Sequence, residues 1–167
     1  MIARISGIIG ESIVDGTGLR TTIFFQGCPH GCPGCHNPQT HDPNEGEEKE
    51  LDTILEDIKK NPLLDGVTLS GGEPFFQAAA AADFAKKAHE QGLNVWTYTG
   101  YCWEEILQAE NPDWMKLLQC TDVLVDGRFI QKERTLDMPF VGSRNQRVID
   151  VEESLKTNKI VLHAFSN

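Results

Sequence analysis

Three of the five cysteines in the chain lie close together, in a stretch that reads CPHGCPGC. They are Cys28, Cys32 and Cys35. Thiolates are soft ligands that suit zinc and iron–sulfur clusters. The two prolines fix the local backbone, and the glycines allow it to wrap closely around a metal centre. We therefore predict a metal site with these three cysteines as its ligands.

The number of cysteines bears on which metal is bound. A structural zinc site usually has four ligands, often two separated CxxC pairs, whereas this stretch has one such pair and one further cysteine upstream. Three cysteines can hold three irons of a 4Fe–4S cubane and leave the fourth iron open to another ligand. We favour this open cluster. The alternative is a zinc site that adds His30, His36 or His41 to the three thiolates.

The cysteine stretch follows a run of β-branched and aromatic residues, 21–26, which predicts a strand that ends at Gly27. Strands are also expected at residues 67–70, 93–98 and 122–126, with helices at residues 51–61, 76–91, 103–107 and 114–118. Alternating strands and helices predict right-handed βαβ units and a parallel sheet.

Chain length limits how far such a sheet can extend. A βαβ unit takes about 30 residues, and a closed eightfold barrel takes about 250, whereas this chain has 167. We therefore expect an α/β fold, a partial (open) parallel β/α barrel of about five or six βα units, in a single domain over residues 1–167. The polar residues 41–50 predict a solvated loop, and residues 148–151 and 159–165 are each candidate strands.

Unusual residues follow each of the four expected strands. After the cysteine stretch come SGGEP at residues 70–74, TGY at residues 99–101 and DGR at residues 126–128. Ligands of α/β sheets bind at the carboxyl ends of the strands, so these loops predict one shared site. By their position there, we favour contacts to a cofactor for Asp126 and Arg128 over an ordinary ion pair.

Composition restricts the possible partners and compartment. Lys and Arg number 15 and Asp and Glu number 25, so the net charge of −10 argues against binding to nucleic acid or to an anionic membrane. No apolar run reaches the roughly 20 residues of a membrane span. A metal site in place of disulfides fits a cytoplasmic protein. We interpret the isolated Cys102 and Cys120 as small packing residues.

Two motifs together resemble those of a known superfamily. The Cys28-x₃-Cys32-x₂-Cys35 spacing is similar to the signature of the radical S-adenosylmethionine superfamily. Residues 70–74 resemble its glycine-rich motif, which lies at the end of the second strand. The two motifs are independent of each other and occur in the expected order.

Further segments resemble one group within that superfamily, the activases of glycyl-radical enzymes. Residues 15–20, which read DGTGLR, are similar to the entry motif of these activases. Similarity to the activases of anaerobic ribonucleoside-triphosphate reductase extends over Asn37 and residues 97–101, 123–129 and 142–146. The resemblance implies reductive cleavage of S-adenosylmethionine and formation of a glycyl radical on the large subunit of that reductase. A small reductant protein such as flavodoxin would supply the electron.

The resemblance also implies the roles of individual residues. The three cysteines hold one 4Fe–4S cluster, its open iron binds S-adenosyl-L-methionine, and no catalytic side chain is needed beyond these groups. The implied cofactor-binding residues are Gly34, Cys35, His36, Gly71, Gly72 and Glu73. Glu73 is either a hydrogen-bond acceptor behind the site or a charge at a helix N-terminus. Many members have an aromatic residue at the position of Gly34, so His36 is our candidate for the adenine contact.

Three other functions remain as alternatives. The chain could be an activase of another glycyl-radical enzyme, such as pyruvate formate-lyase. A zinc-stabilised binding module would be colourless and would not cleave S-adenosylmethionine. An electron carrier would use the cluster for redox chemistry only, although three nearby cysteines are fewer than the usual four ligands.

Overall fold

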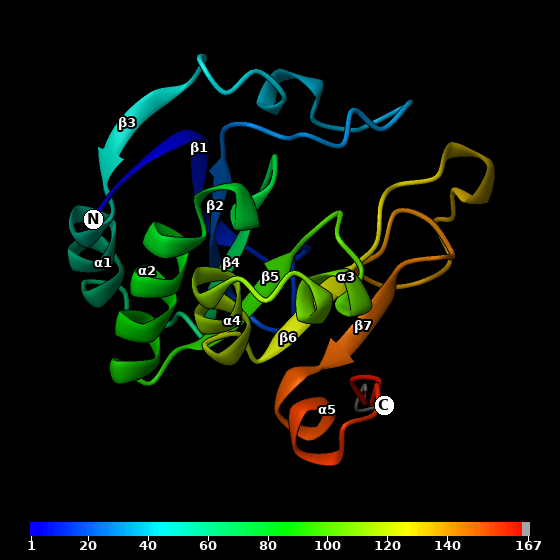
Figure 1. The fold of residues 1–167 in the computed structure, drawn as a ribbon. Coiled ribbons are helices and arrows are strands. Elements are labelled where there is room, and N and C mark those ends of the chain that lie inside the picture. Colours follow the sequence, from blue (N-terminus) through cyan, green and yellow to red (C-terminus); the bar gives the residue numbers. More distant parts are fainter. Residues whose placement is uncertain (165–167) are drawn as a thin grey trace.

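A seven-stranded sheet forms the centre of the computed structural model, which describes residues 1–164 (Figure 1). The strands are β1 (Ile2–Ser12), β2 (Arg20–Phe25), β3 (Glu47–Glu50), β4 (Gly66–Gly71), β5 (Asn94–Tyr98), β6 (Val123–Asp126) and β7 (Arg147–Asp150). Their order across the sheet is β3-β1-β2-β4-β5-β6-β7. The expected open α/β fold is therefore confirmed, with β3 and β7 as its two edges.

Parallel pairing is confined to the middle of the sheet. Strands β2, β4, β5 and β6 run parallel, whereas β1 and β3 on one side and β7 on the other pair antiparallel. The parallel part holds four strands because the chain folds back as a hairpin at the start (β1–β2) and reverses direction again before β7. All four strands of the parallel part were expected from the sequence.

Five α-helices connect or flank the strands. They are α1 (Leu51–Lys59), α2 (Ala78–Glu90), α3 (Trp103–Gln108), α4 (Pro112–Gln119) and α5 (Val151–Thr157). Three short 3-10 helices are η1 (Pro38–Thr40), η2 (Pro74–Gln77) and η3 (Gln131–Glu133). Within residues 1–164, none of these helices has the length and apolar character needed to cross a membrane.

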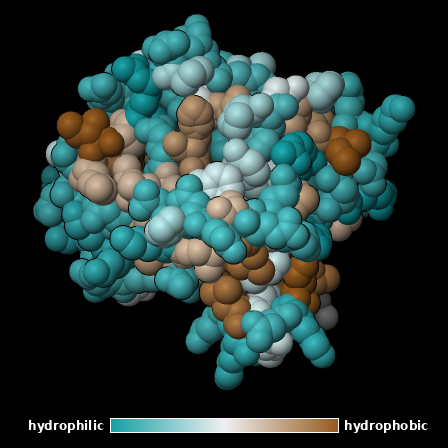
Figure 2. Space-filling model, viewed as in Figure 1, coloured by the Kyte–Doolittle hydropathy of each residue, from teal (hydrophilic) through white to brown (hydrophobic). Residues whose placement is uncertain are grey.

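The hydrophobic core lies between the sheet and a layer formed by α1, α2 and α4 on one of its faces (Figure 1). Helix α2 presents fully buried Ala81, Phe84, Ala85 and Ala88 to this core. Alanine has no side chain beyond Cβ, so α2 can approach the strands closely while Phe84 fills the remaining space. The face seen in Figure 2 is mostly hydrophilic, and hydrophobic side chains gather where the α5 segment joins the rest.

The two faces of the parallel strands serve different purposes. Because side chains alternate along a strand, Ile23 of β2 and Leu69 of β4 are buried in the core. Their neighbours Phe24 and Ser70, which are paired in register, point to the opposite face. In the described part of the chain, the helix layer of α1, α2 and α4 lies on the first face, and the second face borders a cavity.

The sequence prediction missed one strand and misread another. Strand β1 was not predicted, and the expectation of a loop throughout residues 41–50 is wrong for β3, which pairs with β1 through Ile2–Ile5. Strand β3 reads EEKE and is mostly exposed, so it has no apolar face that could have revealed it. Charged side chains are typical of edge strands, where they oppose pairing with another chain.

The predicted strand at residues 148–151 corresponds to β7. Of the candidate strand at residues 159–165, the described part forms only an isolated bridge between Leu162 and Ile149, and Phe165 lies outside the described residues.

The core predicts a contrast between two leucines. Leu69 is fully buried in β4, whereas Leu63 is 72% exposed. Leu69→Ala should lower the free energy of unfolding by about 2–5 kcal/mol, because it leaves a cavity, and Leu63→Ala should change it by less than about 0.5 kcal/mol. Urea unfolding followed by tryptophan fluorescence measures both. Equal effects of the two substitutions would contradict this assignment of the core.

Candidate functional site

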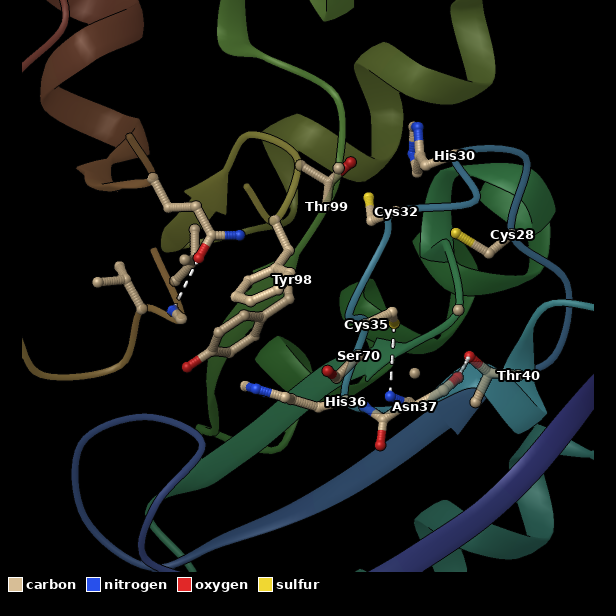
Figure 3. A pocket seen from close by; sticks show the side chains of 18 of the residues that line it. Cys28, His30, Cys32, Cys35, His36, Asn37, Thr40, Ser70, Tyr98 and Thr99 are labelled. Carbon is tan, nitrogen blue, oxygen red and sulfur yellow. Dashed lines mark hydrogen bonds between the residues drawn. The ribbon is translucent and has the colours of Figure 1, made fainter. Parts of the chain in front are cut away.

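A cavity of about 420 Å³ opens at the carboxyl ends of the parallel strands. The loops that follow β2, β4, β5 and β6 all contribute to its wall, as the strand pattern predicts. Its floor is the second face of the sheet, formed by Phe24, Ser70, Tyr98 and Val125, one from each parallel strand. Figure 3 shows the cysteines gathered on one side of this space, with Tyr98 on the other.

The cysteine loop lines the cavity and is closed by short backbone hydrogen bonds. Gly27 N–H donates to the carbonyl of Thr40 at 2.7 Å, and Cys28 N–H donates to the carbonyl of His41 at 3.1 Å. Gly27 has a φ of +103°, which favours glycine at this turn. These two hydrogen bonds join the start and the end of the segment 27–41, so the three cysteines lie in a closed loop at the end of β2.

The three thiols fit an iron–sulfur cluster better than a single metal ion. Cys28, Cys32 and Cys35 are all free and partly buried, and the N–H of Asn37 lies 3.4 Å from the sulfur of Cys35, a hydrogen bond of the kind that tunes such clusters. Among the described residues, the only trio of metal-ligating groups with all donor atoms within 4.8 Å of one another lies elsewhere. In this structure the three sulfurs therefore do not all lie within 4.8 Å of one another, whereas a single ion with metal–sulfur bonds of about 2.3 Å would hold them closer than that.

The histidines of the zinc alternative are placed differently from one another. His30 lines the cavity, and its Nε2 lies 2.6 Å from Oε1 of Glu73. His36 lies in the cavity wall against the ring of Phe129, with ring centroids 5.1 Å apart. His41 also lines the cavity, and its Nε2 is buried with no hydrogen-bond partner among the described residues. Sequence reasoning considered His41 only as a zinc ligand and missed it as a polar contact for a small molecule.

Burial affects the chemistry of the first cysteine. Burial raises the pKa of the Cys28 thiol, and the negative charges of Glu73 and of the neighbouring cysteines add to this rise. A positively charged metal centre reverses this preference, because coordination removes the thiol proton. Binding of a metal by these thiols would therefore be coupled to proton release.

Glu73 lies beneath the cavity and not in its wall. The side chain is 0% exposed, and its carboxylate accepts hydrogen bonds from His30 Nε2 at 2.6 Å, the Thr99 hydroxyl at 2.8 Å and Gly100 N–H at 2.8 Å. It also accepts one from Phe75 N–H at 3.1 Å, at the start of η2. The sequence analysis left two roles open for Glu73, a hydrogen-bond acceptor behind the site or a charge at a helix N-terminus. Its position is compatible with both.

The two glycines before Glu73 are needed for reasons of packing. A Cβ at Gly71 would lie 2.3 Å from the backbone nitrogen of Phe25, and the φ of Gly71 is +99°. A Cβ at Gly72 would lie 2.4 Å from the carbonyl oxygen of Gly27. Both residues line the cavity. The turn after β4 is therefore held tightly against β2, and both glycines lie in the wall of the cavity.

Three other residues that the sequence analysis considered for the site lie outside the cavity wall. Gly34 does not line the cavity, and its Cα lies against the side chain of Gln131. Asp126 is buried in an ion pair with Arg147, and Arg128 pairs with Glu105. The structure therefore shows for Asp126 and Arg128 the ion pairs that the sequence left as the alternative, and neither side chain lines the cavity.

That ion-pair network also accounts for the compact trio of metal-ligating groups, which consists of Cys102, Glu104 and Asp126. Arg147 binds both carboxylates of this trio, so a cation already occupies their centre.

A further wall of the cavity comes from a segment near the C-terminus. Thr135, Leu136, Phe140 and Val141 line the cavity, and Leu136 is 88% exposed. The segment is held in place by Gln146, whose side-chain oxygen accepts from the N–H of Gly142 at 2.8 Å. Sequence reasoning noted residues 142–146 but did not predict that this segment closes over the site.

Comparisons with known proteins agree with this geometry. A family model described as "4Fe-4S single cluster domain" matches residues 14–149. The chain is 35% identical over 144 residues to the anaerobic ribonucleoside-triphosphate reductase-activating protein of Salmonella typhi, covering 81% of this chain and 91% of that protein. The protein of the same name from Escherichia coli (strain K12) is 34% identical over 145 residues, with the same two shares.

Two other similarities are more partial. The pyruvate formate-lyase-activating enzyme of Clostridium pasteurianum is 38% identical over 117 residues, which covers 65% of this chain and 49% of that protein. The solved structure of QueE from Escherichia coli matches 60% of this chain and 53% of that chain, with a TM-score of 0.46 and 18% identity. This structural similarity is too low to carry an argument.

The glycine turn predicts a difference between two glycine substitutions. Gly71→Ala should lower the free energy of unfolding by about 2 kcal/mol or more, because the new Cβ meets the backbone of β2 and the φ is unfavourable. Gly10→Ala is the matched control, since a Cβ there meets nothing within 4 Å. Thermal unfolding of the metal-free protein measures both. An equally stable Gly71→Ala variant would contradict the packing described here.

The cysteine loop predicts which thiols retain iron. After anaerobic reconstitution with iron and sulfide, Cys28→Ala, Cys32→Ala and Cys35→Ala should each lose the visible absorbance and most of the bound iron. Cys102→Ala and Cys120→Ala should keep both, because these thiols lie outside the cavity wall. Full colour in a Cys28→Ala variant would exclude Cys28 as a ligand.

Proposed function

The chain belongs to the family of the anaerobic ribonucleoside-triphosphate reductase-activating proteins, and on this basis we propose that it generates a glycyl radical on the large subunit of such a reductase. The observation that carries the proposal is the cavity in which Cys28, Cys32 and Cys35 meet the glycine turn after β4. The proposed cofactors are one 4Fe–4S cluster and S-adenosyl-L-methionine.

A 4Fe–4S cluster held by Cys28, Cys32 and Cys35 would supply one electron for reductive cleavage of the sulfonium of S-adenosylmethionine, and the deoxyadenosyl group released would take a hydrogen atom from a backbone glycine of the target protein. The role of this chain is to bind, orient and shield the reactants. Because the three cysteines provide three ligands only, one iron remains for the amino and carboxylate groups of S-adenosylmethionine.

The cavity has the size and character of a site for a small molecule. Its volume of about 420 Å³ lies within the range of roughly 300–1,000 Å³ for such sites. In this proposal the backbone of Gly71 and Gly72 faces the methionine end, next to the cysteines. His36 and Phe129, whose rings are in contact, form the candidate surface for the adenine. Among the residues predicted to bind the cofactor, Gly34 is the weakest candidate, because it lies outside the cavity wall.

The wall formed by residues 135–142 helps to exclude water from the site. A carbon-centred radical must meet its target before it meets other donors of hydrogen, and exclusion of solvent limits such side reactions. Leu136 is exposed at the mouth of the cavity, where a glycine-bearing loop of the partner would have to enter. We propose that the reductase approaches the cavity from this mouth.

The remaining partners are proposed on chemical grounds. A small one-electron donor such as flavodoxin would reduce the cluster. The net charge of −10 disfavours nucleic acid and anionic membranes as partners, and a cluster of three thiolates fits the reducing environment of the cytoplasm.

A second candidate target is pyruvate formate-lyase, since an activating enzyme of that protein is also similar to this chain. Coverage favours the reductase. The chain spans 91% of the reductase-activating relative but 49% of the pyruvate formate-lyase-activating enzyme.

The proposal predicts product formation that depends on the cysteine loop. The reconstituted protein, given S-adenosylmethionine and dithionite without oxygen, should form 5′-deoxyadenosine, and Cys32→Ala should abolish the product while Cys120→Ala keeps it. With the reductase large subunit present, electron paramagnetic resonance should detect a glycyl radical on that subunit. A protein that keeps zinc, takes up no iron and forms no product would support the binding module instead. A radical on pyruvate formate-lyase alone would overturn the choice of target.

A further inference from the structure

A buried pair of side chains joins the cysteine loop to the carboxyl ends of β4 and β5. His30 lies between Cys28 and Cys32 in the sequence, and its side chain is 4% exposed. Its Nε2 lies 2.6 Å from Oε1 of Glu73, which has no exposed surface. Since an ionised carboxylate has only acceptors, Nε2 is the donor in this bond.

The other bonds to Glu73 come from the side of the sheet and not from the cysteine loop. Thr99 and Gly100 donate to it from the end of β5, and Phe75 donates from the start of η2. The carboxylate is thus held by donors outside the cysteine loop in addition to His30. Among the described residues of the cysteine loop, His30 is the one whose side chain forms a hydrogen bond with this carboxylate.

Gly100 creates the space that His30 occupies. A Cβ at Gly100 would lie 2.4 Å from Cδ2 and 2.6 Å from Nε2 of His30. The φ of Gly100 does not lie in the left-handed region, so alanine would be acceptable there if the imidazole were absent. On its other side, His30 meets the ring of Tyr101 edge-on at 4.6 Å.

The charge of Glu73 reaches the thiolates that would hold the cluster. His30 lies two residues from Cys28 and two from Cys32, and its Nε2 is 2.6 Å from the carboxylate, so a single side chain separates this charge from the cysteine loop. Reduction adds one negative charge to an iron–sulfur cluster, and nearby charge and hydrogen bonds set its reduction potential. A hydrogen bond donated by His30 to the Glu73 carboxylate partly offsets the negative charge of that carboxylate.

We propose that His30 is a positioning residue with two linked effects: it fixes the cysteine loop on Glu73 and it offsets the charge of that carboxylate, which makes the cluster easier to reduce. This inference rests on the proposed function, because it needs an iron–sulfur cluster in the cysteine loop. It assigns to His30 and Glu73 a role in setting the potential of the cluster, beyond the cysteine ligands themselves.

The first test compares variants of the two partners whose effects should have opposite signs. In a dithionite titration of the reconstituted protein followed by electron paramagnetic resonance, His30→Ala should shift the midpoint potential to more negative values. Glu73→Gln should shift it to more positive values, because the charge is lost while the shape is kept. His30→Gln, whose amide can still donate to Glu73, should restore most of the potential of the unaltered protein.

A purely structural role would not produce this pattern. Loosening of the loop would move both potentials in the same direction, or would reduce iron content without a shift. Shifts of the same sign for His30→Ala and Glu73→Gln, or no shift in either, would overturn the charge effect.

The second test uses Gly100 to displace His30 without altering either partner. In the unaltered background, Gly100→Ala should lower the melting temperature of the metal-free protein and shift the potential of the loaded protein in the direction of His30→Ala. In a His30→Ala background, Gly100→Ala should add little to either, since the clash is gone. Gly10→Ala is the control in both backgrounds. If Gly100→Ala changed the melting temperature and the midpoint potential equally in the unaltered protein and in the His30→Ala variant, the placement of His30 against Gly100 would be wrong.

The outcomes separate this inference from the proposed function. A protein that takes up iron, forms 5′-deoxyadenosine and shows no opposite shifts would overturn the role of His30 alone. A protein that takes up no iron would overturn both.

Discussion

Beneath the cavity, the carboxylate of Glu73 is enclosed completely, and the site depends on how this charge is satisfied. An ionised group without partners in a protein interior costs several kcal/mol, so the surrounding backbone has to supply donors. The donors come from the end of β5, from the start of η2 and from the cysteine loop. Three loops that are distant in the sequence are therefore fixed relative to one another before any cofactor binds.

The parallel strands convert this arrangement into a cavity. Their alternating side chains bury Ile23 and Leu69 against the helix layer on one face and leave Phe24 and Ser70 for the floor of the site on the other. In a closed barrel that inner face would be filled by side chains. Here the sheet is open, with β7 running antiparallel at its edge, and the segment 135–142 covers part of the space instead. The fold thus provides a cavity that is walled but still accessible to a partner.

The sequence predicted those features that depend on local patterns. Parallel strands carry continuous apolar runs, and the cysteine spacing and the glycine turn are local, so both could be recognised. Strand β3 could not, because EEKE becomes a strand only through its pairing with β1. The pairing of Glu73 with His30 could not be recognised either, because the two residues lie 43 positions apart and nothing in the spacing shows that their side chains meet. The ion pair of Asp126 could not be recognised for a similar reason, as its partner Arg147 lies 21 residues further along the chain.

The central claim is that the cavity holds a 4Fe–4S cluster on three cysteines with one iron open to S-adenosylmethionine. Mössbauer spectroscopy tests it most directly, on protein reconstituted with isotopically enriched iron and measured before and after S-adenosylmethionine is added. The structure predicts that one iron of the four changes its signal on addition, because it alone lacks a cysteine ligand. Four irons that all keep their signals, or a protein that binds no iron, would contradict the claim.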